Sequence, residues 1–246
     1  MNKNRITVLE EIAKNYHLNE EMPDKFIEDI CQDYCCEWMK QFISPTDIVI
    51  ELGYGEGVTL SRLSGLVNNY SVIEGAPSLI KIIRDKFPEV NVIHSLFEEY
   101  EAKNTFDKIL ALHVLEHVDS PVILAKHLSN WLKPNGEMIV IVPNRESMHR
   151  RLALALGLIP TLDTLSGRDL LVGHQRVYSL ASLVHDLESA GFEVIDHRGF
   201  FIKPFSNQMM LSYSRDMIQA LNLIGEEIPT ELQANIAVRA RKRRGN

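Results

Sequence analysis

Two carboxylates and three glycines stand together in the run ELGYGEG, residues 51–57. Glycines at such spacing let a ligand approach the backbone closely, as nucleotide-binding turns of several kinds require. The spacing is G-x-G-x-G, and Val58 stands where a dinucleotide-binding turn has its third small residue. Glu51 and Glu56 would repel a pyrophosphate, whereas they would attract a ligand with an ammonium and a sulfonium group. The run therefore disfavours NAD.

Another carboxylate, Glu74, ends the next apolar run, YSVIE (70–74). At this place in a nucleotide-binding sheet, an acidic side chain accepts hydrogen bonds from ribose hydroxyls. We therefore predict that Glu74 binds a ribose. A ribose combined with positive charge favours S-adenosylmethionine as the ligand.

A third group, His113, Glu116 and His117, lies in the run HVLEH. The bare pattern H-x-x-E-H also occurs in zinc metalloproteases, where both histidines lie on one face of a helix. Here the pattern directly follows an apolar run typical of a buried strand, so we predict no metal site. Imidazole, with a reference pKa of about 6.5, suits proton transfer near neutral pH. His117 is expected to act as a base, to orient a substrate, or only to cap the next helix. His113 is expected either to take part in catalysis or to contribute mainly its backbone to the ligand site.

Short apolar runs alternate with amphipathic stretches between residues 48 and 143, and these elements must position the three groups. The runs are continuously apolar, which predicts a parallel sheet buried on both faces. We expect helices after Gly57, at 78–87 and at 120–132, and strands at 48–52, 70–74, 90–94, 106–112 and 137–143. In a doubly wound sheet, ligands bind beyond the carboxyl ends of the strands. All three groups lie at such ends.

The rest of the chain divides into a helical segment before the sheet and a second half after it. Apolar residues at three- and four-residue steps predict a helix over 23–42. Residues 144–178 lack a clear period, apart from the apolar run RRLALALGLI, and are expected to form an insertion. Beyond them we expect helices at 179–189 and 206–223 and strands at 192–200 and 235–242.

The composition fits one globular domain of ordinary type. The 246 residues are 45% hydrophobic and 24% charged, with a formal net charge of −7, which argues against DNA binding. No run approaches the roughly 18 apolar residues of a membrane span, and the start lacks a signal-peptide pattern, so a cytoplasmic protein without stable membrane insertion is expected. The three cysteines are expected to be reduced. The basic end is expected to be solvated and comprises Arg239, Arg241, Lys242, Arg243 and Arg244.

In combination, four stretches of the chain resemble the class I S-adenosylmethionine-dependent methyltransferases, from about residue 45 to the end. They are VIELGYGEG (49–57), VIEG (72–75), FDKILALHVLEHV (106–118) and LKPNGEMIVIVPN (132–144). The resemblance implies a doubly wound, Rossmann-like α/β sheet of seven strands with the last strand antiparallel. It also implies that Gly53 and Gly55 line the methionine end of the cofactor, that Glu74 holds the ribose, and that Ser95 and Leu96 border the adenine. The residues expected around the cofactor are Glu51, Gly53, Tyr54, Gly55, Glu74, Gly75, Ser95, Leu96, Leu112 and His113.

The chain also resembles the ubiquinone-pathway O-methyltransferases, in which the segment after the fourth strand faces the transferred methyl group. We therefore expect a single methyltransferase domain over 1–246. Its parts would be an N-terminal helical cover (1–44), a cofactor-binding core (45–143), a lid insertion after strand five (144–178) and the C-terminal half of the sheet (179–246). His174 in the insertion is expected to contact the acceptor. Because Arg pairs well with carboxylate and phosphate, the basic residues of the insertion favour an anionic acceptor, while the alternative for most of its polar residues is a solvated charged surface. These polar residues are Arg145, His149, Arg150, Arg151, Arg168, Arg176 and Tyr178.

The expected function is methyl transfer to an oxygen or nitrogen of a small-molecule metabolite. Three alternatives stay open at this point. The apolar run in the insertion suggests a quinone or lipid-precursor O-methyltransferase at a membrane surface. The basic end suggests an RNA or protein methyltransferase, and a cofactor-binding protein without turnover is the third alternative. The sequence leaves the acceptor and the oligomeric state open.

Overall fold

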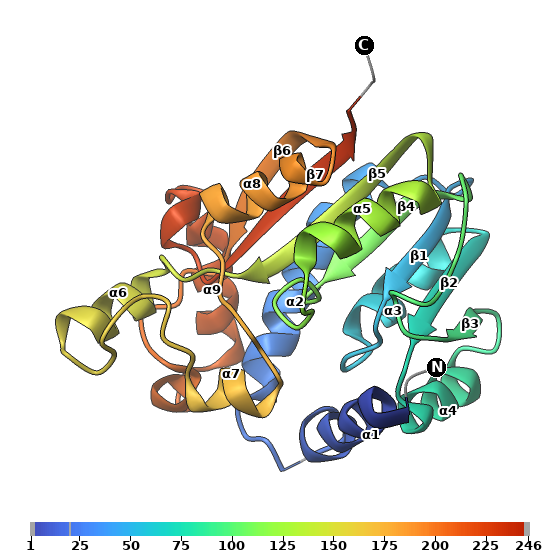
Figure 1. Cartoon of the computed structure of the whole chain (residues 1–246). Coiled ribbons are helices and arrows are strands. Elements are labelled where there is room, and N and C mark those ends of the chain that lie inside the picture. The colour runs from blue at the N-terminus through green and yellow to red at the C-terminus, as the bar shows by residue number, and fades with distance from the viewer. Residues whose placement is uncertain (1–2, 20, 244–246) are drawn as a thin grey trace.

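A seven-stranded sheet forms the centre of the protein, in a computed structural model that describes residues 3–19 and 21–243 (Figure 1). Its strand order is β3-β2-β1-β4-β5-β7-β6. The strands are β1 (Ile48–Leu52), β2 (Asn69–Glu74), β3 (Asn91–His94), β4 (Phe106–Leu112), β5 (Leu132–Pro143), β6 (Phe192–Phe200) and β7 (Asn235–Lys242). Only β7 runs antiparallel to its neighbours, β5 and β6, in this sheet. The predicted doubly wound sheet with an antiparallel last strand is confirmed.

The register of the parallel strands brings the predicted chemical groups to one edge. Leu52 of β1 pairs with Ile73 of β2, and Glu74 pairs with His94 of β3. On the other side of β1, Glu51 pairs with Leu110 of β4. The carboxyl ends of these four strands therefore lie next to one another, as a doubly wound sheet requires.

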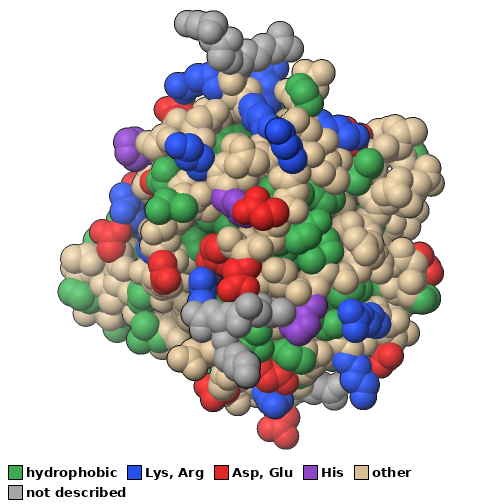
Figure 2. Space-filling view, turned by 45° about the vertical axis from the view of Figure 1, so that its right-hand side comes forward, with side chains coloured by type: hydrophobic (Ala, Val, Ile, Leu, Met, Phe, Trp, Pro, Cys, Tyr) green, Lys and Arg blue, Asp and Glu red, His purple; other side chains and the backbone are tan. Residues whose placement is uncertain are grey.

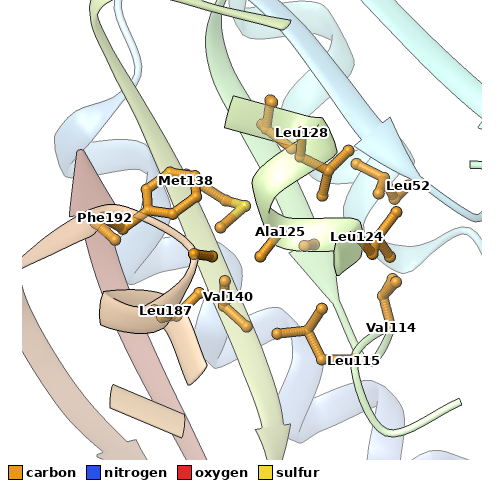
Figure 3. Close-up of a cluster of buried hydrophobic side chains, with 14 of the residues drawn as sticks. Leu52, Val114, Leu115, Leu124, Ala125, Leu128, Met138, Val140, Leu187 and Phe192 are labelled. Carbon is orange, nitrogen blue, oxygen red and sulfur yellow. The ribbon is translucent and has the colours of Figure 1, made fainter. Parts of the chain in front are cut away.

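Helices cover both faces of the sheet and bury its apolar side chains. On one face lie α5 (Pro121–Trp131) and α8 (Leu180–Ser189), with a core cluster that includes Leu124, Leu187 and Phe192 (Figure 3). The other face is covered by α2 (Lys25–Met39), α3 (Val58–Leu63) and α4 (Pro77–Lys86). Burial on both faces explains why the central strands are continuously apolar.

The N-terminal residues form α1 (Lys3–Ile12) and the short π-helix η1 (Ala13–His17), which lie along the carboxyl edge of β2 and β3. Short helical turns occur at η2 (Lys40–Phe42), η3 (Ser64–Leu66) and η5 (Thr230–Leu232). The insertion, residues 144–178, contains α6 (Met148–Ala155) and α7 (Gly167–Leu171). In Figure 1, α6 stands at the outer edge of the molecule and α7 lies near η1.

Two predicted elements differ from the observed ones. The helix predicted over 206–223 is divided into η4 (Asn207–Met210) and α9 (Arg215–Gly225). The segment contains two helix N-caps, because Ser206 and Ser214 each accept a hydrogen bond from a backbone N–H three residues later. A new helix therefore begins after Ser214. Strand β5 begins at Leu132 rather than 137, since Leu132 pairs with Phe106 ahead of a register shift.

The basic end is held against the sheet by acidic partners. Arg239 pairs with Glu137 at 3.2 Å, and Arg241 pairs with Glu193 at 3.1 Å. Figure 2 shows Lys and Arg side chains on the upper part of one face and acidic side chains near its middle. Arg244 lies outside the described residues. No helix in the described ranges is long and apolar enough to cross a membrane, and the three cysteines are free and buried.

Candidate active site

One large cavity opens at the carboxyl ends of β1, β2, β4 and β5, with a volume of about 1180 Å³. Its wall includes residues of α1, η1 and α2 on one side and of the insertion on another. Pockets that bury one drug-sized ligand usually measure about 300 to 1,000 Å³. This cavity is therefore larger than one such ligand usually fills.

The glycine turn after β1 exposes its backbone to this cavity. Gly55 has φ of 54°, and a Cβ atom there would meet no heavy atom within 4 Å. Gly57 has φ of 78°, and a Cβ atom there would lie 2.3 Å from the hydroxyl of Tyr54, whose ring folds over it. Both positions favour glycine, the second by close packing as well as by φ. The turn offers open backbone at Gly55 and an aromatic wall at Tyr54.

Glu74 is buried and fixed by backbone donors. It accepts hydrogen bonds from the N–H groups of Gly75 at 2.7 Å, Ala76 at 2.8 Å and Tyr54 at 3.0 Å. A carboxylate has about four acceptor sites. Glu74 therefore retains capacity for a hydroxyl donor from the cavity, which its side chain lines.

Glu51 is buried behind the turn, where its carboxyl accepts a hydrogen bond from the hydroxyl of Tyr70 at 2.8 Å. Burial raises the pKa of Glu51 to about 8, the nearby charge of Glu74 adds to the rise, and the Tyr70 hydrogen bond opposes it. Glu51 is therefore mostly neutral at pH 7. A cation placed in the cavity beside it would favour its ionised form.

Glu56 joins the turn to the N-terminal helices. It lies 3.0 Å from Nδ1 of His17 in η1. Burial opposes ionisation of Glu56, but the hydrogen bond and charge of His17 and the charge of Lys25 outweigh it and lower the pKa of Glu56. Leu9 of α1 covers Gly75, because a Cβ atom there would lie 2.6 Å from it. The N-terminal helices thus close this end of the cavity.

The residues after β3 line the same end. The N–H of Ser95 donates to the carbonyl of Glu74 at 3.2 Å, and its hydroxyl donates to the carbonyl of Leu96 at 3.0 Å. Leu96 is buried against Gly75. Both predicted adenine-side residues therefore lie in the cavity wall, next to Glu74.

His113 follows β4 in a strained backbone conformation. Its φ of 54° is rare for a residue with a side chain and is typical of functional sites. Its N–H donates to the carbonyl of Ile141 at 2.7 Å, and its Nδ1 lies 3.2 Å from Oε1 of Glu116. Burial opposes protonation of the ring, but Glu116 outweighs it and raises the pKa of His113. The side chain is 34% exposed and lines the cavity beside Leu112.

His117 and His174 lie edge to face, with ring centroids 4.6 Å apart. Burial lowers the pKa of His117 to about 4; Glu116 opposes this shift, and the charges of His174 and His113 add to it. Nδ1 of His174 lies 2.9 Å from Oδ1 of Asp169. The structure thus brings the three predicted histidines to one wall of the cavity.

The returning part of the insertion is bonded to the loop that carries His113 and His117. The N–H of Gln175 donates to the carbonyl of Glu116 at 2.8 Å, and its side chain donates to the carbonyl of His117 at 2.7 Å. Arg176 donates to the carbonyls of Leu115 and Val118. Residues 173–178 therefore position the loop after β4.

The arginines of the insertion all have internal partners. Arg145 pairs with Asp163 at 2.6 Å, and Arg150 donates to the carbonyl of Leu162 at 2.9 Å. Arg151 donates to the carbonyl of Glu146 at 2.6 Å, and Arg168 bonds to Asp24 and Tyr16. These residues build the insertion and fasten it to the N-terminal segment. The prediction of an anionic acceptor loses its original basis, since it relied on free guanidinium groups.

Lys203 and Asn207 in the cavity wall were not predicted, whereas His149 was predicted as one of the basic residues of the insertion. Lys203 lies in the wall and, within the described ranges, its ammonium group makes no hydrogen bond. Nδ1 of His149 is buried without a partner there, and burial together with the charges of Lys203 and Arg150 lowers the pKa of His149 to about 3. Asn207 donates to Asp24 at 3.0 Å and to Glu28. Lys203 and Asn207 follow β6 far from any motif, so spacing along the chain gave no signal for them.

Glu116, His117 and His174 each offer one atom within 4.8 Å of the others, the one group in the described ranges with such a spacing. Histidine nitrogen and carboxylate oxygen are both ligands that zinc takes, so the donor set suits a metal chemically. The absence of a bound metal stays a prediction.

Comparison with known proteins decides the family. A family model described as a methyltransferase domain matches residues 25–197. The chain belongs to this methyltransferase family. It is 25% identical over 115 residues to the mitochondrial ubiquinone biosynthesis O-methyltransferase of Schizosaccharomyces pombe, covering 44% of this chain and 42% of that protein. It is 26% identical over 156 residues to an S-adenosylmethionine-dependent methyltransferase of Mycolicibacterium smegmatis, covering 62% of this chain and 54% of that protein. The chain thus spans about half the length of these relatives.

Among solved structures, the methyltransferase found in complex with the Trm112 activator of Haloferax volcanii has the same fold. The TM-score is 0.66 at 12% identity, and the superposition covers 97% of this chain and 99% of the other. Membership of this family indicates that the cofactor is S-adenosylmethionine. The cavity of this chain fits it, because Glu56 and an ionised Glu51 suit a ligand with positive charge and Glu74 suits ribose hydroxyls.

Proposed function

We propose that this protein transfers the methyl group of S-adenosylmethionine to an oxygen or nitrogen of a small-molecule acceptor. The observation that carries the proposal is a single cavity of about 1180 Å³ shared by Glu74, the glycine turn and the histidines after β4. When bound, the cofactor supplies a methyl group already activated by the sulfonium. The protein then has to align the acceptor, exclude water and remove a proton where the acceptor carries one.

Residues of β1, β2 and β3 would hold the cofactor. Glu74 would accept hydrogen bonds from the ribose, since its remaining acceptor capacity faces the cavity. Gly53 and Gly55 offer a backbone that a methionine group can approach. Glu56 supplies negative charge nearby, and Glu51 would ionise beside a bound cation. Ser95 and Leu96 would border the adenine beside Gly75.

His113 is the better candidate for the base. With Nδ1 facing the Glu116 carboxylate at 3.2 Å, its ring favours the Nδ1–H tautomer, which leaves the Nε2 lone pair for an acceptor proton. Its raised pKa also makes the ring a stronger base than an ordinary imidazole. His117, with a pKa of about 4, is a weaker base and would contribute to the wall against His174.

Lys203 and His149 support an acceptor with an anionic group. Both line the cavity, and the ammonium of Lys203 makes no hydrogen bond in the described part of the chain. An anion between them would gain the charge of Lys203 and a hydrogen bond from the N–H of the neutral His149 ring. Lys203 and His149 thus replace the insertion arginines as the residues proposed to bind an anionic group of the acceptor.

A second candidate function is methylation of a quinone or lipid precursor at a membrane surface. Leucines of the insertion stand out from the molecule, with 64% exposure for Leu156, 72% for Leu158 and 63% for Leu170. Apolar side chains on an amphipathic surface can enter the boundary of a bilayer. Sedimentation with anionic lipid vesicles tests this candidate. Loss of binding in the Leu156→Ser, Leu158→Ser double variant would support it, and absence of wild-type binding would refute it.

Transfer of a radiolabelled methyl group from S-adenosylmethionine to a panel of phenols, catechols, amines and sugar acids tests the proposal. Turnover with one class, reduced about 10²- to 10⁴-fold in His113→Ala, is the expected result. The exposed Glu89→Gln provides the control, because it lies away from the cavity. Binding of the cofactor without transfer to any class would favour a cofactor-binding protein and contradict the proposal.

A further inference from the structure

Glu116 is a completely buried carboxylate with few partners. Its Oε2 has no hydrogen-bond partner among the described residues, while Oε1 lies 3.2 Å from Nδ1 of His113 and 4.0 Å from Nε2 of His174. A buried charge is costly unless nearby groups compensate it. Burial opposes ionisation of Glu116, and the three histidines around it outweigh that cost and lower its pKa. Two of these histidines belong to the same loop, and the third comes from the insertion.

Asp169 determines how that third histidine faces Glu116. Oδ1 of Asp169 lies 2.9 Å from Nδ1 of His174. Oδ2 of Asp169 accepts hydrogen bonds from the N–H and the hydroxyl of Ser166, three residues earlier, both at 2.7 Å. Burial opposes ionisation of Asp169, but these hydrogen bonds outweigh it and lower its pKa. An ionised Asp169 can only accept, so Nδ1 of His174 must carry hydrogen. Nε2 of His174 faces Oε1 of Glu116 at 4.0 Å, a distance at which the two groups attract each other when the ring is protonated.

We propose that Asp169 is a positioning residue of the active site, which orients His174 against Glu116 and thereby sets the orientation of His113. The groups form an alternating row, from Asp169 through His174 and Glu116 to His113. This inference rests on the proposed function, because it treats His113 as the group that meets the acceptor. The insertion would then help to orient the proposed base as well as enclose the acceptor.

The other charged groups near the row belong to several elements. Glu116 faces His113, His117 and His174. His113 also senses Glu28 of α2 and Glu56 of the glycine turn. Arg150 of α6 lies 3.6 Å from Asp169. Since Asp169 is the charged group bonded to the far nitrogen of His174, removing its charge should change that ring most directly.

The test is a tautomer measurement that needs no acceptor. Protein with ¹⁵N-labelled histidine is saturated with S-adenosylhomocysteine, and ¹H–¹⁵N spectra at pH 7 report which ring nitrogen carries hydrogen. In the wild type we expect His174 and His113 both in the Nδ1–H form when neutral. In Asp169→Asn, His174 should lose this preference, and the ring signals of His113 should shift as well. Asp169→Glu should restore part of the wild-type spectrum.

Two control variants separate positioning from stability. Asp163→Asn removes a carboxylate of the same insertion that pairs with Arg145, and it should leave both histidine spectra unchanged. Ser214→Ala removes the cap of α9, outside the insertion, so it should lower the thermal midpoint without changing the tautomers. Signals of His113 that stay unchanged in Asp169→Asn, while those of His174 change, would overturn the proposal.

Turnover gives a second readout once an acceptor is identified. In a catalytic triad, replacing the orienting Asp by Asn lowers kcat by about 10⁴-fold through the wrong tautomer. Asp169 acts one imidazole and one carboxylate further away, so a fall of about 10- to 100-fold in kcat is expected, with an altered pH profile and little change in KM. If no acceptor is turned over, the proposed function fails while the spectra still decide the role of Asp169. A higher KM for the acceptor with an unchanged kcat would contradict the proposal, because it would assign Asp169 to the acceptor pocket.

Discussion

Replacing Glu74 by Gln separates the two roles of this carboxylate, which the structure combines. In the protein alone, Glu74 accepts three backbone N–H groups, from Tyr54, Gly75 and Ala76. A glutamine can keep its oxygen toward Gly75 and Ala76, but its amide nitrogen then meets the N–H of Tyr54, and two donors face each other. The variant should therefore lose stability before any ligand is added.

The magnitude follows from the bonds lost. A hydrogen bond to a charged group contributes about 1.5 to 3 kcal/mol. For a chain of this size, each kcal/mol shifts the thermal midpoint by about 2 to 4 °C, so Glu74→Gln should lower it by about 3 to 12 °C. If the ribose also bonds to Glu74, affinity for S-adenosylhomocysteine should fall by about tenfold to a hundredfold.

Differential scanning calorimetry without ligand and titration calorimetry with S-adenosylhomocysteine measure the two effects. Glu89→Gln, an exposed glutamate that is not in the cavity wall, serves as the control. A thermal midpoint equal to that of the wild type would refute the role of Glu74 in fixing the turn. Unchanged affinity, with the midpoint lowered, would refute the ribose assignment alone.

Four further predictions follow from the site. His113→Ala should keep cofactor affinity within a few-fold while turnover falls by about 10² to 10⁴, and His117→Ala should lose less; equal losses would contradict the choice of base. Because the pKa of Glu51 is raised to about 8, its contribution to stability is complete below about pH 4.5 and is lost as the pH rises through 8. Glu51→Gln should remove that slope in pH-dependent unfolding, and a retained slope would assign it to another group. Hydrogen exchange should show residues 144–178 opening more readily than β1 and β4, with protection rising when S-adenosylhomocysteine is bound; protection equal to the strands without ligand would make the insertion a fixed wall. Treatment with EDTA should leave turnover unchanged, and restoration of lost activity by a divalent ion would establish a metal at Glu116, His117 and His174.

The sheet and its carboxyl edge could be predicted because their signals are local. Continuous apolar runs indicate buried parallel strands, and the glycine turn with Glu74 indicates where two of them end. The structure places β1 and β2 within one residue of the predicted bounds and has the last strand antiparallel. The three predicted histidines also lie in the cavity wall, since two follow β4 directly and the insertion must return to the sheet.

The partners of these residues could not be predicted, because they depend on contacts between distant segments. Arg168 bonds to Asp24, 144 positions away in the chain. Asp169 and His174 are only five positions apart, but their contact depends on the fold of the turn after α7. Runs of arginine look alike in sequence whether they are free or bonded to carbonyls, so the expected anion site moved from the arginines to Lys203. The break between η4 and α9 was missed because Ser214 was counted as part of one amphipathic pattern rather than as a cap.

The location of the cofactor is the central claim, and a crystal structure with S-adenosylhomocysteine tests it most directly. The account predicts ribose hydroxyls hydrogen-bonded to the Glu74 carboxylate, the adenine beside Ser95 and Leu96, and the sulfur directed toward His113. A ribose without contact to Glu74, or a sulfur directed away from the loop after β4, would contradict it.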